Sequence, residues 1–90
     1  MIEIVRIYDM KQKEVINSSD GVRLGFISDI EVDMENGKII KVFVPGPSKI
    51  LGMFGGQKEY AIPWDSITKI GEDIILVEID VDKALLDSKY

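Results

Sequence analysis

The chain has 90 residues and a mass of 10.1 kDa, a size that fits one domain. It contains no cysteine and no histidine, which excludes disulfides, zinc–cysteine sites, thiolate nucleophiles and histidine-based catalytic triads. A net charge of −5 opposes nucleic-acid binding, and the longest apolar runs are far too short to span a membrane. The amino-terminal segment lacks the apolar region of a signal peptide, so we expect a cytoplasmic protein.

Alternation of apolar and polar residues dominates the chain and predicts short antiparallel strands. We predict strands over 14–17, 24–32 and 38–45. Gly21 closes a turn in the first connection, and the pair Asn36-Gly37 predicts a hairpin tip in the second.

The two longer strands are expected to bury their faces differently. In the strand over 24–32, one buried face carries the even-numbered residues Leu24, Phe26, Ser28, Ile30 and Val32. In the strand over 38–45, Ile39 and Phe43 share a face with Lys41, and the opposite face carries Ile40, Val42 and Val44. A closed barrel buries only one face of a strand, so Ile39 and Phe43 are candidates for an interface.

The second half of the chain begins with a long glycine-rich loop, expected over 46–57. Strands follow over 58–62 and 73–81, with a short strand and a turn between them. Pro63 ends the first of these strands and starts a short helical turn. The strand over 73–81 is expected to carry one apolar face, made of Ile75, Val77, Ile79 and Val81.

The tail over 82–90 is expected to form a short helix or a frayed end, with Asp82 as the helix N-cap. The predicted fold is therefore all-β, a small barrel of five to six short antiparallel strands. Closure of the sheet into a barrel would remove exposed strand edges.

An ordered set of motifs in this chain resembles the PRC-barrel family. The family's opening motif, D-G-x-x-L-G-x-x-x-D, is matched by Asp20, Gly21, Leu24, Gly25 and Asp29. A G-[KR] hairpin follows at Gly37 and Lys38, and the closing I-P-W motif is matched at 62–64. The I-L-G-x-F-G loop at 50–55 is similar to that of the short, single-domain PRC-barrel proteins of spore-forming bacteria, which are associated with sporulation.

The resemblance implies one PRC-type barrel domain over 1–90, with a core over about 6–81 and a tail over 82–90. It implies a cytoplasmic location and no known catalysis. Relatives include the cytoplasmic domain of the photosynthetic reaction-centre H subunit and the C-terminal domain of a 16S rRNA maturation factor, where the domain is an adaptor. Trp64 is expected to be largely buried in the barrel, since it lies in the closing motif.

Two other patterns in the sequence could indicate a metal site or a phosphate site. The carboxylates of Asp29, Glu31, Asp33 and Glu35 alternate along the chain, but they lack the glycine and glutamate spacing of a calcium-binding EF-hand loop. We expect a solvated strand face there and no metal. The glycine-rich segment over 46–57 contains neither of the usual phosphate-binding motifs, so we expect no cofactor.

The loop over 46–57 is the strongest functional candidate in the sequence. It gathers the large apolar residues Ile50, Leu51, Met53 and Phe54 among glycines and beside lysines. Exposed apolar loop residues indicate a partner or self-association surface, to which Ile39 and Phe43 would contribute. The alternative is a loop that folds Ile50 and Phe54 over the barrel end.

The sequence favours a non-enzymatic protein-interaction module with an unidentified protein partner, linked to sporulation by the resemblance. A homodimer or other homo-oligomer is expected, because a core this small gains from extra apolar burial. The alternative is an RNA- or ribosome-associated module, by analogy with the rRNA maturation factor, although the acidic charge opposes it. No residue spacing supports catalysis.

Overall fold

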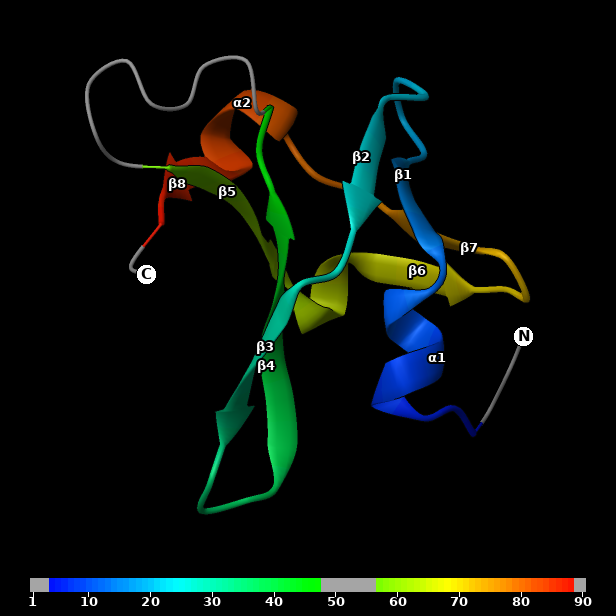
Figure 1. Ribbon diagram of the computed structural model, residues 1–90, viewed down its shortest axis with the longest axis vertical. Coiled ribbons are helices and arrows are strands. Elements are labelled where there is room, and N and C mark those ends of the chain that lie inside the picture. The colour runs from blue at the N-terminus through cyan, green and yellow to red at the C-terminus, as the bar shows by residue number, and fades with distance from the viewer. Residues whose placement is uncertain (1–3, 48–56, 89–90) are drawn as a thin grey trace.

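The computed structural model describes residues 4–47 and 57–88, and it contains two four-stranded sheets (Figure 1). The first sheet has the strand order β2-β1-β7-β6, and the second has the order β3-β4-β5-β8. The elements along the chain are α1 (Ile7–Lys11), β1 (Glu14–Asn17), β2 (Arg23–Phe26), β3 (Asp29–Asp33), β4 (Lys38–Pro45), β5 (Lys58–Pro63), the 3₁₀ helix η2 (Trp64–Ser66), β6 (Ile67–Ile70), β7 (Ile74–Val77), α2 (Val81–Ala84) and β8 (Leu85–Asp87).

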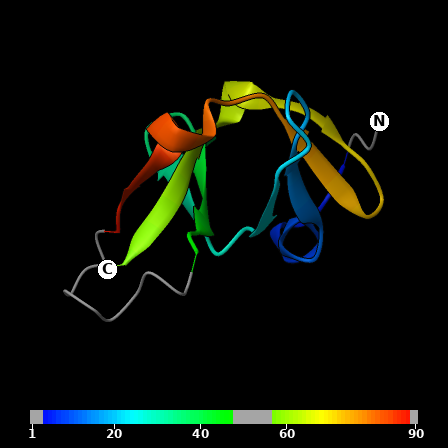
Figure 2. The ribbon, with the colours of Figure 1, turned by 90° about the horizontal axis from the view of Figure 1, so that it is seen from above.

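The all-β class is confirmed, but two details of the predicted barrel are wrong. The described residues form eight short strands rather than five or six, and β1 pairs with β7 in parallel. Within the described residues no strand pairing joins the two sheets, which form the arms of an arch when seen from above (Figure 2). None of the described helices is long and apolar enough to cross a membrane.

The core lies between the two sheets and is made mostly of their inward-facing residues. Val15, Ile75 and Val77 of the first sheet and Val44 and Ile62 of the second are completely buried. The remaining buried apolar residues are Met10, Leu24, Ile27, Val42 and Tyr60. Trp64 is only partly buried, although it packs against this cluster at the end of β5.

The predicted strand over 24–32 is two strands, because the chain crosses there from the first sheet to the second. Residues 27 and 28 lie between β2 and β3, and the backbone N–H of Ser28 donates to Phe43 O at 2.8 Å. This break shifts the alternation, so Ile27 is buried while Phe26 is 50% exposed. The prediction that Phe26 and Ser28 belong to a buried face is therefore wrong.

Strand β4 contains a bulge that a regular alternation cannot reveal. Lys41 pairs with Glu31 and Ile39 pairs with Val32, so Ile40 is the extra residue on β4. Ile39 packs against the core and Ile40 is 43% exposed. The prediction that Ile39 shares a face with Phe43, and Ile40 with Val42, is wrong beyond this bulge.

The predicted strand over 73–81 ends at Val77, and the tail is more ordered than expected. The side chain of Asn17 hydrogen-bonds both backbone groups of Ile79, in place of strand pairing. Asp80, not Asp82, caps α2 by accepting a hydrogen bond from the N–H of Lys83. Strand β8 then adds to the edge of β5.

Candidate functional site

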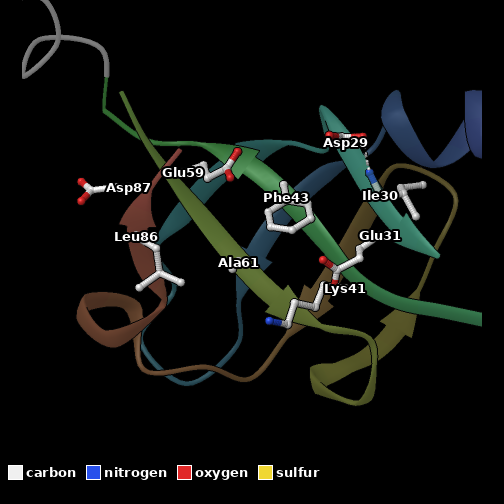
Figure 3. Close-up of a pocket in the computed structure, with 9 residues that line it drawn as sticks. All are labelled: Asp29, Ile30, Glu31, Lys41, Phe43, Glu59, Ala61, Leu86 and Asp87. Atoms are coloured by element: carbon white, nitrogen blue, oxygen red, sulfur yellow. Dashed lines mark hydrogen bonds between the residues drawn. The ribbon is translucent and has the colours of Figure 1, made fainter. Parts of the chain in front are cut away.

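The outer face of the sheet β3-β4-β5-β8 carries a hollow of about 290 Å³ (Figure 3). Its lining residues all belong to the four strands of this sheet, so no other described element contributes to it. They are Asp29, Ile30, Glu31, Lys41, Phe43, Glu59, Ala61, Leu86 and Asp87. We call this surface the outer face.

Strand alternation explains why these side chains gather there. On β4, Val42 and Val44 point into the core, so Phe43 between them points outward. On β5, Tyr60 and Ile62 are buried in the same way, so Glu59 and Ala61 beside them point to the outer face.

Strand register brings the outward side chains together around Phe43. Phe43 is paired with Asp29 on β3 and with Ala61 on β5. Glu59 is paired with Leu86 on β8, one step further along the sheet. Phe43 lies near the middle of the labelled side chains, with Leu86 toward one edge (Figure 3).

The rim of the outer face is acidic. Asp29, Glu31, Glu59 and Asp87 supply four carboxylates, against the single lysine Lys41 among the lining residues. Asp87 is neutralised by Lys58, whose ammonium lies 2.6 Å from Oδ1 of Asp87. Among the described residues, Glu31 and Glu59 form no ion pair, so no cation within salt-bridge distance neutralises either carboxylate.

The structure brings one predicted interface residue into this surface and places another elsewhere. Phe43 is half-buried at the centre of the outer face, as a strand with two apolar faces predicts. Ile39 packs against the core instead, because of the bulge in β4. The other candidates, Ile50, Leu51, Met53 and Phe54, lie outside the described residues.

The carboxylates over 29–35 do not act as one ladder. Asp29 and Glu31 line the outer face, whereas Asp33 closes the β3–β4 turn by accepting hydrogen bonds from Glu35 and Asn36. These hydrogen bonds, the one from the Asn36 side chain most of all, lower the pKa of Asp33 below its usual value. Within residues 4–47 and 57–88, no three acidic residues are grouped so as to hold a metal ion.

Sequence reasoning missed Glu59, Ala61 and Leu86 as members of this surface. The alternation in the segment 58–62 contains the signal for the first two, because Tyr60 and Ile62 are its apolar positions. Leu86 gives no such signal, since its outward position depends on the tail pairing with β5.

Comparison with known sequences places the chain among proteins of the same size. It is 43% identical to the probable sporulation protein YlmC of Bacillus subtilis (strain 168), over 84% of this chain and 94% of that protein. It is 44% identical to an uncharacterized protein of Clostridium acetobutylicum, over 79% of this chain and 80% of that protein. It is 27% identical to the uncharacterized protein YmxH of Bacillus subtilis, over 83% and 89% of the two chains.

A sequence model of the PRC-barrel domain matches residues 2–84 of this chain. The motif residues have structural roles consistent with that match. Gly21 and Gly37 adopt positive φ in their turns, as predicted, and Ile62 of the closing motif is completely buried. The chain belongs to the PRC-barrel family.

Proposed function

We propose that this chain is a non-enzymatic interaction module that docks another protein on its outer face, in a role linked to sporulation. The observation that carries the proposal is the position of Phe43. A large aromatic side chain lies at the centre of a hollow on a sheet face, outside the buried core cluster. Aromatic residues that are half-buried in surface hollows are typical anchors of protein interfaces.

The relationship to a probable sporulation protein supports the second part of the proposal. The two chains are 43% identical, and the alignment covers 94% of that relative. Because the alignment covers most of both chains, a shared role is the simplest hypothesis.

A catalytic role is less well supported by the chemistry of the outer face. A carboxyl pair that works as acid and base needs one member in apolar, enclosed surroundings. Asp29, Glu31 and Asp87 are exposed at the rim, and only Glu59 is half-buried.

The predicted homodimer is a separate proposal about assembly. The β3–β4 hairpin projects from the body of the molecule (Figure 1) and carries exposed apolar residues. Met34 is 88% exposed, and Val32 and Ile40 are each more than 40% exposed. We propose that a second copy packs against this hairpin rather than against the outer face.

The docking proposal can be tested by site-specific cross-linking in sporulating Bacillus subtilis cells, which contain a 43% identical relative. A photo-reactive phenylalanine analogue replaces Phe43 in one variant and Lys69 in the control. Lys69 is exposed on β6, in the other sheet. We expect protein adducts from position 43 in sporulating cells and not from position 69.

Adducts formed equally from both positions, or none from position 43, would contradict docking on the outer face. Adducts from position 43 that ribonuclease removes would favour the RNA-associated alternative.

A further inference from the structure

The outer face combines an apolar centre with an acidic rim, and this combination limits what can bind there. We propose that it takes a basic segment of a partner protein, in which lysine or arginine residues flank one large apolar side chain. This inference rests on the proposed docking function and adds the chemistry of the partner.

The charges of the rim determine the sign of the charge that the partner segment must carry. Glu31 and Glu59 lie on either side of the strand that carries Phe43, and Asp29 is paired directly with Phe43. Lys41 offsets one of these three charges, and Lys58 already neutralises Asp87. The net charge of −5 for the whole chain adds a field of the same sign, which speeds the approach of a cationic partner.

The apolar centre determines the second feature of the partner. Phe43, Ala61 and Leu86 line the hollow of about 290 Å³, and Leu86 is 50% exposed. An apolar cavity of roughly 150 Å³ is enough to hold a benzene molecule. The hollow therefore has room for one large apolar or aromatic side chain, placed between the carboxylates.

The same charges argue against two other occupants. A second copy that met this surface with its own outer face would place its rim against the identical carboxylates, and like charges that meet in an interface oppose association. A nucleic acid would bring phosphates to the same acidic rim.

The test selects 12-residue peptides from a random displayed library on the wild-type protein. Selected peptides are then titrated into isotope-labelled protein and followed by nuclear magnetic resonance, which suits a chain of 10.1 kDa. We expect selected sequences rich in lysine and arginine around one large apolar residue. Their binding should shift the amide signals of Glu31, Phe43 and Ala61 while leaving those of Thr68 and Lys69 unchanged.

Two pairs of charge reversals give a matched comparison. Glu31→Lys with Glu59→Lys changes the rim, and Glu35→Lys with Glu72→Lys makes the same change of charge at exposed sites outside it. Both variants carry a net charge of −1, because each reversal adds two charges to −5. We expect the rim variant to bind about tenfold more weakly and the control variant to keep most of the affinity.

Two further variants test the apolar centre. Phe43→Thr removes the aromatic ring and keeps a residue suited to a strand. Leu86→Thr removes a second apolar side chain at an exposed position, and it provides the test if Phe43→Thr unfolds the protein. We expect each folded variant to lose binding by at least about tenfold.

Neutral or acidic selected peptides, failure to select any peptide, or equal weakening by both charge-reversed variants would each overturn the inference. The proposed function fails separately, through the cross-linking at position 43. A cross-linked partner whose contact segment is acidic or uncharged would leave docking intact and overturn only the basic partner.

Discussion

Asn17 is a completely buried polar residue that joins three segments of the chain. Its side-chain amide donates to Asp20 Oδ1 and to Ile79 O, both at 3.0 Å, and its Oδ1 accepts from Ile79 N at 3.0 Å. Asp20, from the family's opening motif, also accepts from the N–H of Val22. A single side chain therefore fixes the turn after β1 and the segment that follows β7.

We expect Asn17→Ala to lower the free energy of unfolding by about 2–3 kcal/mol, because it leaves both backbone groups of Ile79 without their partners. Urea denaturation of the purified protein measures this loss. Ser19→Ala removes only a long, peripheral hydrogen bond of 3.3 Å and should change the value by less than about 0.5 kcal/mol. Equal effects of the two substitutions would show that the amide network does not stabilise the fold.

The Asp33 carboxylate should titrate below the usual aspartate value of about 3.9. The Asn36 side chain and the N–H groups of Glu35 and Asn36 all donate to it and lower its pKa. Since the pKa is lower in the folded state, the stability that Asp33 contributes is present above its unfolded pKa. That contribution is lost as the pH falls through the folded pKa.

A carbon-detected titration by nuclear magnetic resonance measures the Asp33 midpoint directly. Asn36→Ala removes the largest cause of the shift, so the midpoint should rise toward the usual value. A wild-type midpoint at about 3.9 or above, unchanged by Asn36→Ala, would show that the hydrogen bonds of the turn do not lower the pKa of Asp33.

At the scale of elements, β2 and β4 approach closely where the chain passes between the sheets. Gly25 on β2 has a φ of 124°, and a Cβ atom there would lie 3.3 Å from Cγ1 of Val44. Gly37 in the hairpin has a φ of 68°, and a Cβ atom there would meet nothing within 4 Å. Both positions have a positive φ that residues other than glycine rarely adopt, and Gly25 in addition allows the close approach of Val44.

This difference predicts unequal costs of substitution. Gly37→Ala should destabilise the protein by about 1 kcal/mol, and Gly37→Asn by less, because asparagine tolerates the left-handed conformation. Gly25→Ala should lower the free energy of unfolding by about 2–3 kcal/mol, and Gly25→Asn should lower it by at least as much. Thermal or urea unfolding of the four variants tests the order, and equal costs at the two sites would contradict it.

Local sequence rules predicted the elements whose limits depend on nearby residues. The strands at 14–17, 38–45 and 58–62, the Asn36-Gly37 tip and the turn after Pro63 are confirmed, because alternation and turn chemistry determine them. The outward position of Phe43 follows from the same alternation. These are the parts of the candidate site that the sequence could predict.

Long-range contacts determine the features that were missed. The end of β7 depends on Asn17, 62 residues away from Ile79, and β8 exists as a strand because it pairs with β5. The bulge at Ile40 turns Ile39 toward the core, and no turn residue marks its position in the sequence. Leu86 and the final shape of the outer face therefore could not be predicted from local patterns.

At the scale of the whole molecule, two surfaces of different chemistry lie on one acidic chain. The outer face has carboxylates around Phe43, whereas the β3–β4 hairpin carries Val32, Met34 and Ile40 exposed on its projecting end. Contacts made by the outer face with a basic partner gain from attraction, which added salt screens. Two copies that meet through their hairpins must instead overcome the repulsion between net charges of −5.

We therefore predict that self-association strengthens with salt while binding of a basic peptide weakens. The wild type should be measured by sedimentation from about 1 to 100 μM, a range that brackets weak dimers. We expect a dimer whose dissociation constant decreases when the salt concentration is raised from about 50 to about 500 mM. Met34→Asp should weaken this dimer, because it places a charge in the contact, whereas Phe43→Asp should leave it intact. A mass that stays near 10.1 kDa throughout would refute the dimer. A dimer that Phe43→Asp disrupts and Met34→Asp does not would place self-association on the outer face, against the charge argument for that surface.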